Sequence, residues 1–283
     1  MPLAATLAQA AAAAGYRPDD PLVIAVGRPG RRPAHLARGC LPTGGAFTVD
    51  TRVYAASLAK QVVAACAAVL RLDVDRPVSA YVPGAPPDLR LRHLIHHVGG
   101  PPPGTRYAYS NQGYVLLAEA IGRAAGEPLP GLARRLIFEP LGMSSSEFWA
   151  GPQPHPPGAA PLDPADPPPL SIGDGGLWTT APDLLRWAAA LDADRLGITG
   201  IVQTPGRLDD GTPLDYAWGM GVRERNGRRE YRHGGGYADL RAMLVRVPAR
   251  GLDLVVLALG DRTERRTGLT DRLLRILLAQ HRP

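Results

Sequence analysis

Apolar residues are spaced as β-strands at both ends of the chain and as helices between them. Near the N-terminus, residues 22–28 and 34–39 flank Pro29-Gly30 and are typical of a β-hairpin. A third short strand is predicted over residues 46–49. After Asp50 the pattern changes to helical or irregular.

The middle of the chain has the marks of several helices. Residues 57–72 are apolar at helical spacing, and the segment 111–125 carries an apolar face before a stop at Gly126. Thr180-Ala-Pro-Asp183 has the form of a capping box that opens a helix running to Leu191. Nine prolines crowd residues 152–169, which predicts an irregular surface loop within the domain.

The last third returns to β-structure. Residues 216–224 and 228–233 flank Asn226-Gly227, a dipeptide that strongly favours a hairpin turn. Residues 239–247 and 252–259 are predicted as two further antiparallel strands, followed by a terminal helix over about 266–280.

These patterns predict an α/β (α+β) fold in which both chain ends build one antiparallel sheet flanked by helices. We expect a single domain over residues 1–283. Its sheet lobe would comprise 1–56 and 205–283, and the inserted, mainly helical lobe 57–204.

Composition and charge argue against several classes of function. Although the net charge is +6, basic residues are spread along the chain and aromatic residues make up 6%, so we expect no nucleic-acid partner. The two cysteines are too few for a disulfide framework. The first residues lack the basic region of a signal peptide, and no apolar run has the length of a membrane span. We therefore expect a cytoplasmic protein without membrane contact, of undefined oligomeric state.

The basic residues contain one anomaly. Of 32 basic side chains only Lys60 is lysine, and it stands three residues after Ser57. Codon bias explains why lysine is rare but not where this one lies. Residues i and i+3 share a helix face, so the amine can reach the hydroxyl. A lysine with a lowered pKa can activate a serine, which arginine cannot do. The alternative is an ordinary N-cap serine followed by an exposed lysine.

Two further segments carry candidate chemistry. Tyr109-Ser110-Asn111 precedes a predicted helix, so Tyr109 can shuttle a proton and Asn111 can donate to a substrate carbonyl if Lys60 lies nearby. The alternative is a turn with a helix cap. In His233-Gly234-Gly235-Gly236, the glycines would let a substrate lie close to a strand. The alternative is a flexible turn.

The order S-x-x-K, Y-S-N and H-G-G resembles the serine β-lactamase and penicillin-binding-protein superfamily. It is most similar to the branch that holds class C β-lactamases, family VIII esterases and D-aminopeptidases. Other segments that look like family sequence include YAASLAKQVVAA, LRHLIHH, PPGTRYAYSNQGYVLLAEAIGRAAGEPL, IFEPLGM, GDGGLWTTAPDLLRWAAAL and YRHGGGYADLRAMLVRVP. Together they extend from about residue 52 to 260.

The resemblance implies a role for each motif. Ser57 would be the nucleophile, Lys60 its base, and Tyr109 the residue that passes protons to the leaving group. The backbone N–H groups of Ser57 and Gly236 would form the oxyanion hole. Asn111 would orient the substrate.

His233 would stand where many relatives carry the lysine of K-T-G, with Gly234 and Gly235 lining the substrate site beside it. A histidine carries less fixed charge at neutral pH than lysine, which weakens the interpretation as a β-lactamase specialist. The segments 70–76 and 98–106 are also shorter than in the family. These shorter segments suggest a further hypothesis, that the active site is open or that its geometry is compromised.

The leading hypothesis is a serine hydrolase that acts on a small-molecule ester, amide or acyl substrate without a cofactor. One alternative is an acyltransferase or cyclase that uses the same acyl-enzyme in biosynthesis. Others are a β-lactamase and a catalytically weak binding or sensor protein. His93, His96 and His97 cluster in the sequence, but no further ligands are evident and no metal site is predicted.

Overall fold

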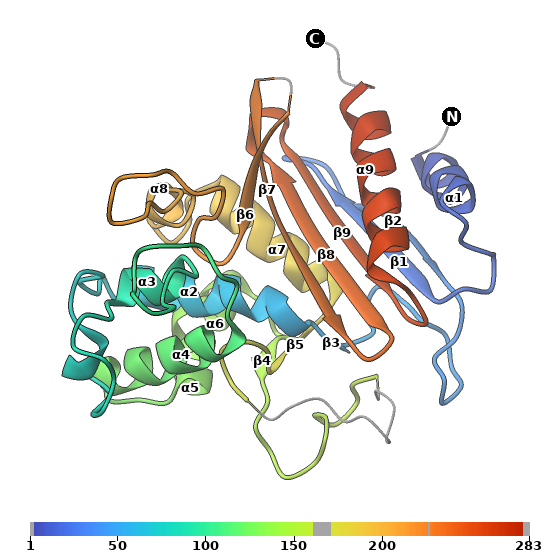
Figure 1. Ribbon diagram of the computed structural model, residues 1–283. Helices are drawn as coiled ribbons and strands as arrows, with labels where there is room; N and C mark the ends of the chain where they lie inside the picture. The colour runs from blue at the N-terminus through green and yellow to red at the C-terminus, as the bar shows by residue number, and fades with distance from the viewer. Residues whose placement is uncertain (1–2, 161–170, 226, 280–283) are drawn as a thin grey trace.

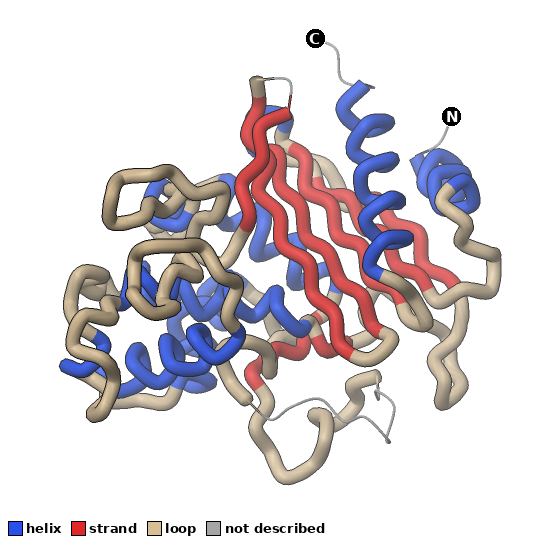
Figure 2. The backbone as a smooth tube through the Cα atoms, in the orientation of Figure 1, coloured by secondary structure: helices blue, strands red, loops and turns tan. Residues whose placement is uncertain are grey.

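The computed structural model describes residues 3–160, 171–225 and 227–279 (Figures 1 and 2). The strands are β1 (Leu22–Gly27), β2 (Ala34–Arg38), β3 (Val53–Tyr54), β4 (Glu147–Phe148), β5 (Leu177–Thr179), β6 (Gly221–Arg225), β7 (Arg228–Tyr237), β8 (Leu240–Val247) and β9 (Leu252–Ala258). The α-helices are α1 (Leu3–Ala13), α2 (Ala59–Val69), α3 (Leu91–Ile95), α4 (Asn111–Ala125), α5 (Leu129–Ala133), α6 (Glu139–Leu141), α7 (Ala181–Asp192), α8 (Thr199–Val202) and α9 (Thr263–Ala279). Short 3₁₀ turns are η1 (Ala56–Leu58), η2 (Val78–Ala80) and η4 (Pro248–Arg250), and η3 (Arg134–Phe138) is a π-helical turn.

Both chain ends contribute to one antiparallel sheet, as the sequence predicts. Its six strands follow the order β2-β1-β9-β8-β7-β6. The N-terminal hairpin β1–β2 pairs with the C-terminal strand β9, and the remaining strands follow as a meander. Every residue of β1 and of β9 is buried, because these central strands are covered on both faces. The mixed architecture and the antiparallel sheet are confirmed.

The two faces of the sheet have separate cores. On one face α1 and α9 cover side chains such as Leu22, Ile24 and Leu254. On the other face α7 and the helical region pack against alternate residues of the same strands, including Val23 and Val255. Figure 1 shows α9 and α1 on the near side of the sheet and α7 behind it. The alternation follows from the two-residue period of a strand.

Helix α2 runs through the core of the helical region. All of its residues from Ala59 to Ala68 are buried, and it contacts α4, α5 and α8. Its C-terminal half, AACAA, consists of small side chains that let these helices approach closely. Cys66 lies in this run and burial raises the pKa of its thiol to about 12, which agrees with a structural cysteine.

Several boundaries differ from the sequence prediction. The strand predicted at 46–49 is wrong: this segment forms only an isolated bridge between Cys40 and Ala46, and the next strand is β3. A turn follows at once, since Thr51 N donates to the carbonyl of Thr48, and it ends the extended segment. The terminal helix also begins earlier than predicted: α9 is continuous from Thr263.

The proline-rich loop is partly described. Residues 151–160 contain no helix, and one isolated bridge joins Arg52 to Ala159. The rest of the predicted loop, Asn226 of the predicted hairpin turn and residue 280 of the predicted terminal helix lie outside the described residues. The lobe boundaries at 56/57 and 204/205 stay a prediction. Among the described helices, none is both long and apolar enough to cross a bilayer.

The sheet contacts the helical region through a glycine in β7. A Cβ added at Gly235 would lie 2.3 Å from the carbonyl oxygen of Ala55, whereas a Cβ at Gly236 would meet only the side chain of Arg241, at 3.3 Å. Gly235 thus marks the place where strand and turn η1 touch backbone to backbone. Predicting a flexible turn here would be wrong, because His233, Gly234, Gly235 and Gly236 all lie within β7.

Gly235→Ala is therefore expected to lower the free energy of unfolding by about 1–3 kcal/mol, because neither backbone can move away cheaply. Gly236→Ala is the matched control and should change it by no more than about 0.5 kcal/mol, since a flexible side chain can shift. Urea unfolding of both variants measures the difference. Equal losses would contradict the close packing of β7 on η1.

Candidate active site

Ser57 lies in a sharp turn between strand β3 and helix α2. The residue before it, Ala56, has a φ of +46°, which is unusual for a residue with a Cβ. The backbone of Ala55 is held on both sides, by a 2.7 Å hydrogen bond to the carbonyl of Leu177 and by contact with Gly235. Ser57 is therefore in turn η1, and α2 begins at Ala59 rather than at residue 57. The turn fixes the serine at the junction of the sheet and the helical region.

Lys60 extends from the first turn of α2 to three oxygen atoms. Its Nζ lies 3.1 Å from Ser57 Oγ, 2.8 Å from Asn111 Oδ1 and 2.9 Å from the carbonyl oxygen of Asp174. The latter two oxygens can only accept hydrogen bonds, whereas the serine hydroxyl can also donate. A neutral lysine amine has two N–H donors and one lone pair. This arrangement satisfies both donors and leaves the lone pair for the Ser57 proton.

Burial shifts the proton affinity of this amine. Lys60 has no exposed surface, and desolvation lowers the pKa of its ammonium to about 8, with the nearby negative charge of Asp174 opposing the shift. None of its three hydrogen-bond partners is itself a carboxylate oxygen. A substantial fraction of Lys60 is thus neutral at a slightly alkaline pH, which suits a general base. The prediction of an exposed, merely structural lysine is wrong.

The Tyr109-Ser110-Asn111 segment brings two side chains to Lys60 because its central residue caps a helix. Ser110 Oγ accepts a hydrogen bond of 2.9 Å from Gly113 N, so α4 begins at Asn111. The ring centroid of Tyr109 lies 5.0 Å from Lys60 Nζ. Burial raises the pKa of the Tyr109 hydroxyl to about 12, although 46% of the residue is exposed. The hydroxyl is therefore protonated at neutral pH.

The carbonyl of Asp174 is a partner that the motifs did not single out. It belongs to the loop Ser171–Gly176, which Tyr54 supports by accepting a hydrogen bond from Gly176 N at 3.2 Å. Gly173 has a φ of +123°, and a Cβ there would lie 2.4 Å from the carbonyl of Tyr114. The glycines of GDGG thus let the loop fold against α4. The density of glycines in this segment is the sequence signal that could have indicated a closely packed loop.

Three buried polar rings form a hydrogen-bonded chain beside the site. His97 Nδ1 accepts from the backbone N–H of Ser110 at 3.1 Å, so its Nε2 carries the proton and donates to Tyr216 Oη at 3.2 Å. The Tyr216 hydroxyl then donates to His233 Nε2 at 3.1 Å. His233 Nδ1 in turn donates to the carbonyl of Gly234 at 2.7 Å. The partners therefore define one tautomer for each histidine.

His97 and His233, the two histidines that Tyr216 links, are neutral at physiological pH. Burial, aided by the charge of Lys60, lowers the pKa of His97 to about 3 and that of His233 to about 4. His233 faces the site, as its place in the motif predicts, but both of its ring nitrogens are bonded within the protein. Tyr216 and His97 were not assigned a role from the sequence. His97 lay in a histidine cluster, and Tyr216 carried no signal.

The predicted glycines lie on the part of β7 that has only one neighbouring strand. β6 pairs with β7 up to Arg232, and from His233 to Tyr237 the ladder continues on the β8 side alone. Gly235 lies against the turn that holds Ser57, and Gly236 is exposed. The open edge of this segment supplies backbone groups next to the serine, which is what an oxyanion hole requires.

A cavity of about 680 Å³ adjoins this edge. Tyr109, Tyr216, His233 and Arg266 are among the residues that line it. Arg266 is buried and donates to the carbonyls of Gly235 and Ala242. The volume suits a small organic molecule.

Metal ligands are not gathered in the described part of the chain, where no cluster of three or more histidine, cysteine or acidic side chains could hold an ion. His93 and His97 have different protein partners. His93 Nδ1 accepts from Arg90 N, while His97 belongs to the chain with Tyr216.

Comparison with known proteins places the arrangement in a family. The family model described as Beta-lactamase matches residues 2–279. A D-aminopeptidase from Cereibacter sphaeroides is 29% identical over 168 residues, which cover 55% of this chain and 32% of that protein. The chain thus spans about a third of the length of the curated relatives it matches.

Solved structures show the same fold. A penicillin-binding protein from Bacillus halodurans superposes with a TM-score of 0.79 at 19% identity, covering 95% of this chain and 98% of that one. A D-amino acid amidase from Ochrobactrum anthropi SV3 in complex with L-phenylalanine gives a TM-score of 0.79 at 19% identity, with coverages of 97% and 98%. The resemblance inferred from the motifs is confirmed, and the chain belongs to the Beta-lactamase family.

Proposed function

We propose that this chain is a serine hydrolase that cleaves small amides or esters through an acyl-enzyme on Ser57. The observation that carries the proposal is the contact set of Lys60 Nζ, with two carbonyl acceptors and the Ser57 hydroxyl as partners. Its lowered pKa supports the same assignment.

In the acylation step Ser57 Oγ attacks the substrate carbonyl carbon and its proton passes to Lys60 Nζ. The carbonyl oxygen becomes negative and accepts hydrogen bonds from the backbone N–H groups of Ser57 and Gly236. The C–N or C–O bond then breaks, and the leaving amine or alcohol takes a proton from Tyr109. Lys60 restores that proton to Tyr109. The Ser57 hydroxyl partly opposes the rise in the pKa of Tyr109, and this proximity supports the assignment.

Water completes the reaction by attacking the acyl carbon. The water proton passes to the lone pair of Lys60, relayed by Tyr109, which gives its own proton to Lys60 as it takes the one from water. Lys60 then gives a proton to Ser57 Oγ as the ester bond breaks. Asn111 holds Lys60 through its side-chain oxygen, which leaves its amide N–H₂ as the group that can orient the substrate carbonyl. We assign Gly234 and Gly235 to the strand edge along which the substrate lies.

His233 has a positioning role in this proposal. Because both of its nitrogens are bonded within the protein and its ring is neutral, it offers no fixed positive charge to a substrate. We infer that it holds the start of the glycine segment in place. A neutral residue here favours esters and amides over β-lactams that need a cation for their carboxylate.

The substrate class follows from the neighbourhood of Ser57. Tyr107 and Tyr109 are both 46% exposed and offer aromatic surface to an apolar acyl group or side chain. The adjoining cavity has room for the leaving group. The names of the D-aminopeptidase and amidase relatives support an amino-acid amide or short peptide. We propose a small-molecule substrate of this kind.

The nucleophile assignment predicts covalent labelling. Incubation with a fluorophosphonate should add one adduct mass to the wild-type protein and none to Ser57→Ala. Ser144→Ala, which removes an exposed serine elsewhere, is the matched control and should be labelled normally. Intact-mass spectrometry measures the adduct. Labelling of Ser57→Ala would overturn the proposal.

The base assignment predicts a pH profile. The hydrolysis rate of one activated ester should rise with pH, reach half of its plateau near pH 8 and then level, because neutral Lys60 is the active form. Lys60→Arg should lower the plateau by about 10² to 10⁴, since arginine keeps its proton. Arg123→Lys, on the exposed face of α4, controls for the exchange of basic residues. A folded Lys60→Arg protein with a near-normal rate would exclude Lys60 as the base.

The hydrogen bonds that Tyr216 makes with His97 and His233 predict the tautomer of each histidine and a loss of stability when they are removed. Tyr216→Phe should lower the free energy of unfolding by about 1–3 kcal/mol, because two histidine nitrogens lose their partner. Wild-type ¹⁵N spectra should show the Nε2–H form for His97 and the Nδ1–H form for His233, and the variant should shift the His233 signals. Tyr81→Phe serves as the control. Unchanged His233 signals in Tyr216→Phe would mean that Tyr216 does not position this ring.

A further inference from the structure

The loop that supplies a carbonyl to Lys60 also carries a carboxylate close to the nucleophile. The main-chain oxygen of Asp174 accepts a hydrogen bond of 2.9 Å from Lys60 Nζ, and the same amine lies 3.1 Å from Ser57 Oγ. The Asp174 side chain is half-buried, and its Oδ1 accepts a hydrogen bond of 2.8 Å from Ser171 Oγ. One lysine amine thus separates Asp174 from the reacting serine.

The negative charge of Asp174 acts on the side chains around Ser57. Burial raises the pKa of the Tyr54 and Tyr109 hydroxyls, and the charge of Asp174 adds to both rises. Burial lowers the pKa of Lys60, and the same charge opposes that fall. These three side chains come from β3, from the segment before α4 and from α2. The carboxylate therefore belongs to the active site, although the proposed mechanism gives it no step.

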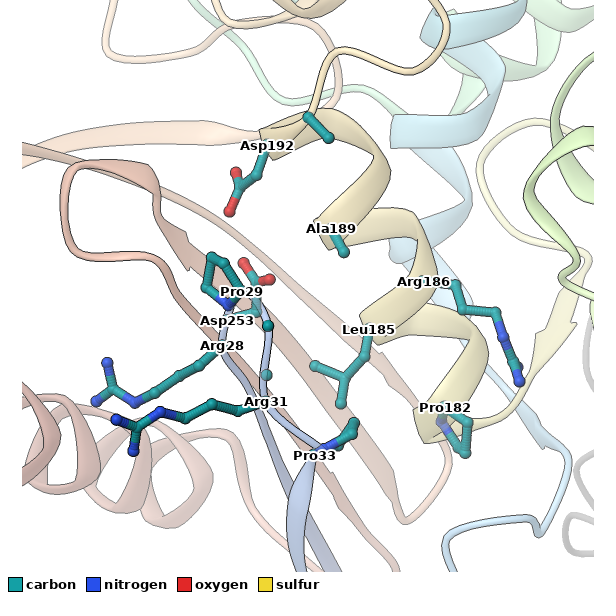
Figure 3. A pocket seen from close by; sticks show the side chains of 13 residues that line it. Arg28, Pro29, Arg31, Pro33, Pro182, Leu185, Arg186, Ala189, Asp192 and Asp253 are labelled. Carbon is teal, nitrogen blue, oxygen red and sulfur yellow. The ribbon is translucent and has the colours of Figure 1, made fainter.

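Asp174 differs from the other acids that are at least half-buried in residues 3–160, 171–225 and 227–279. All of these except Asp253 form an ion pair with an arginine, as Asp20 and Asp192 do. Asp253 is hydrogen-bonded to Asp192, and Figure 3 shows both carboxyl groups in a pocket between the β1–β2 turn and α7. Within the same ranges Asp174 alone has neither a cation nor a second carboxyl group as its partner.

One oxygen of this carboxylate is available to a ligand. Ser171 bonds Asp174 Oδ1, whereas Oδ2 accepts no hydrogen bond from the described residues. Oδ2 is also not among the buried polar atoms that lack a partner, so it retains accessible surface. A carboxylate that is half-buried, accessible at one oxygen and without a counterion is suited to binding a cation from outside the chain.

The charges near Ser57 leave Asp174 unbalanced when the enzyme is active. Lys60 must be neutral to accept the serine proton, and the lowered pKa values of His97 and His233 keep both rings neutral. These groups therefore supply no positive charge in the active form. A positive charge on the substrate is favoured beside the remaining carboxylate.

A cationic group of the substrate fits on the acyl side of the scissile bond. Asp174 is not among the residues that line the cavity assigned to the leaving group, whereas Arg223, Arg232 and Arg266 are. Their charges disfavour a cation in that cavity. In an α-amino acyl group the nitrogen lies about 2.5 Å from the carbonyl carbon that Ser57 attacks. An α-ammonium group is therefore carried close to the serine and to the loop that holds Asp174.

We propose that the Asp174 carboxylate binds the ammonium group of an α-amino acyl substrate and thereby determines the specificity of the site. This inference rests on the proposed hydrolase activity of Ser57 and adds that the acyl part carries a free, charged amine. The ammonium group donates to Asp174 Oδ2, and a charge-assisted hydrogen bond of this kind is stronger than a neutral one. Asp174 makes and breaks no covalent bond. It positions the acyl part for attack.

The test compares each enantiomer of alanine p-nitroanilide with propionic acid p-nitroanilide, which lacks only the amine. The readout is the ratio of kcat/KM for the better alanine substrate to kcat/KM for the propionyl substrate, because both reactions share the same base. Asp174→Asn keeps the main-chain carbonyl and should lower this ratio about tenfold or more. Asp174→Glu, which keeps the charge, should retain part of the preference. Asp88→Asn, at an exposed position, should leave the ratio unchanged.

The wild-type protein offers a second measurement that needs no variant of Asp174. The same ratio should fall as the pH rises through about 8, where an α-amine loses its proton. A constant wild-type ratio across that range, or an unchanged ratio in a folded Asp174→Asn protein, would overturn the role of Asp174 while fluorophosphonate still labels Ser57. Absence of that labelling would instead refute the proposed function, and this inference with it.

Discussion

The burial of one amine is the constraint on which the candidate active site depends. Lys60 is fully enclosed, and its Nζ contacts a hydroxyl, an amide oxygen and a backbone carbonyl. Loss of hydration is the main reason for its lowered pKa. An aqueous lysine would stay protonated and could not accept a proton from serine. The surrounding structure must therefore exclude water while keeping the amine hydrogen-bonded.

Three separate parts of the chain meet that requirement. Helix α2 places Lys60 inside the helical region, the capped start of α4 brings Asn111, and the glycine loop before β5 brings the carbonyl of Asp174. Strand β7 closes the arrangement from the sheet side by touching the turn before Ser57. The three oxygen atoms therefore come from elements that pack together only in the complete fold.

The polar rings beside Ser57 are bonded within the protein. The hydrogen-bonded chain from His97 through Tyr216 to His233 satisfies each ring nitrogen. A satisfied network of this kind is rigid and suits the positioning of reacting groups.

The sequence by itself determined the fold class, most strand positions and the motif residues around Ser57. Periodicity and turn residues indicate local structure. The single lysine among many arginines indicates a residue that must accept a proton, which arginine cannot do. The sequence missed the strand character of the glycine segment, because glycine has no side chain to show a period. It also missed Asp174 as a partner of Lys60, because the contact is made by a backbone carbonyl, which any residue can supply. Only the tertiary structure decided these points, along with the hydrogen-bonded rings through Tyr216. Each depends on contacts between residues that are far apart in the sequence.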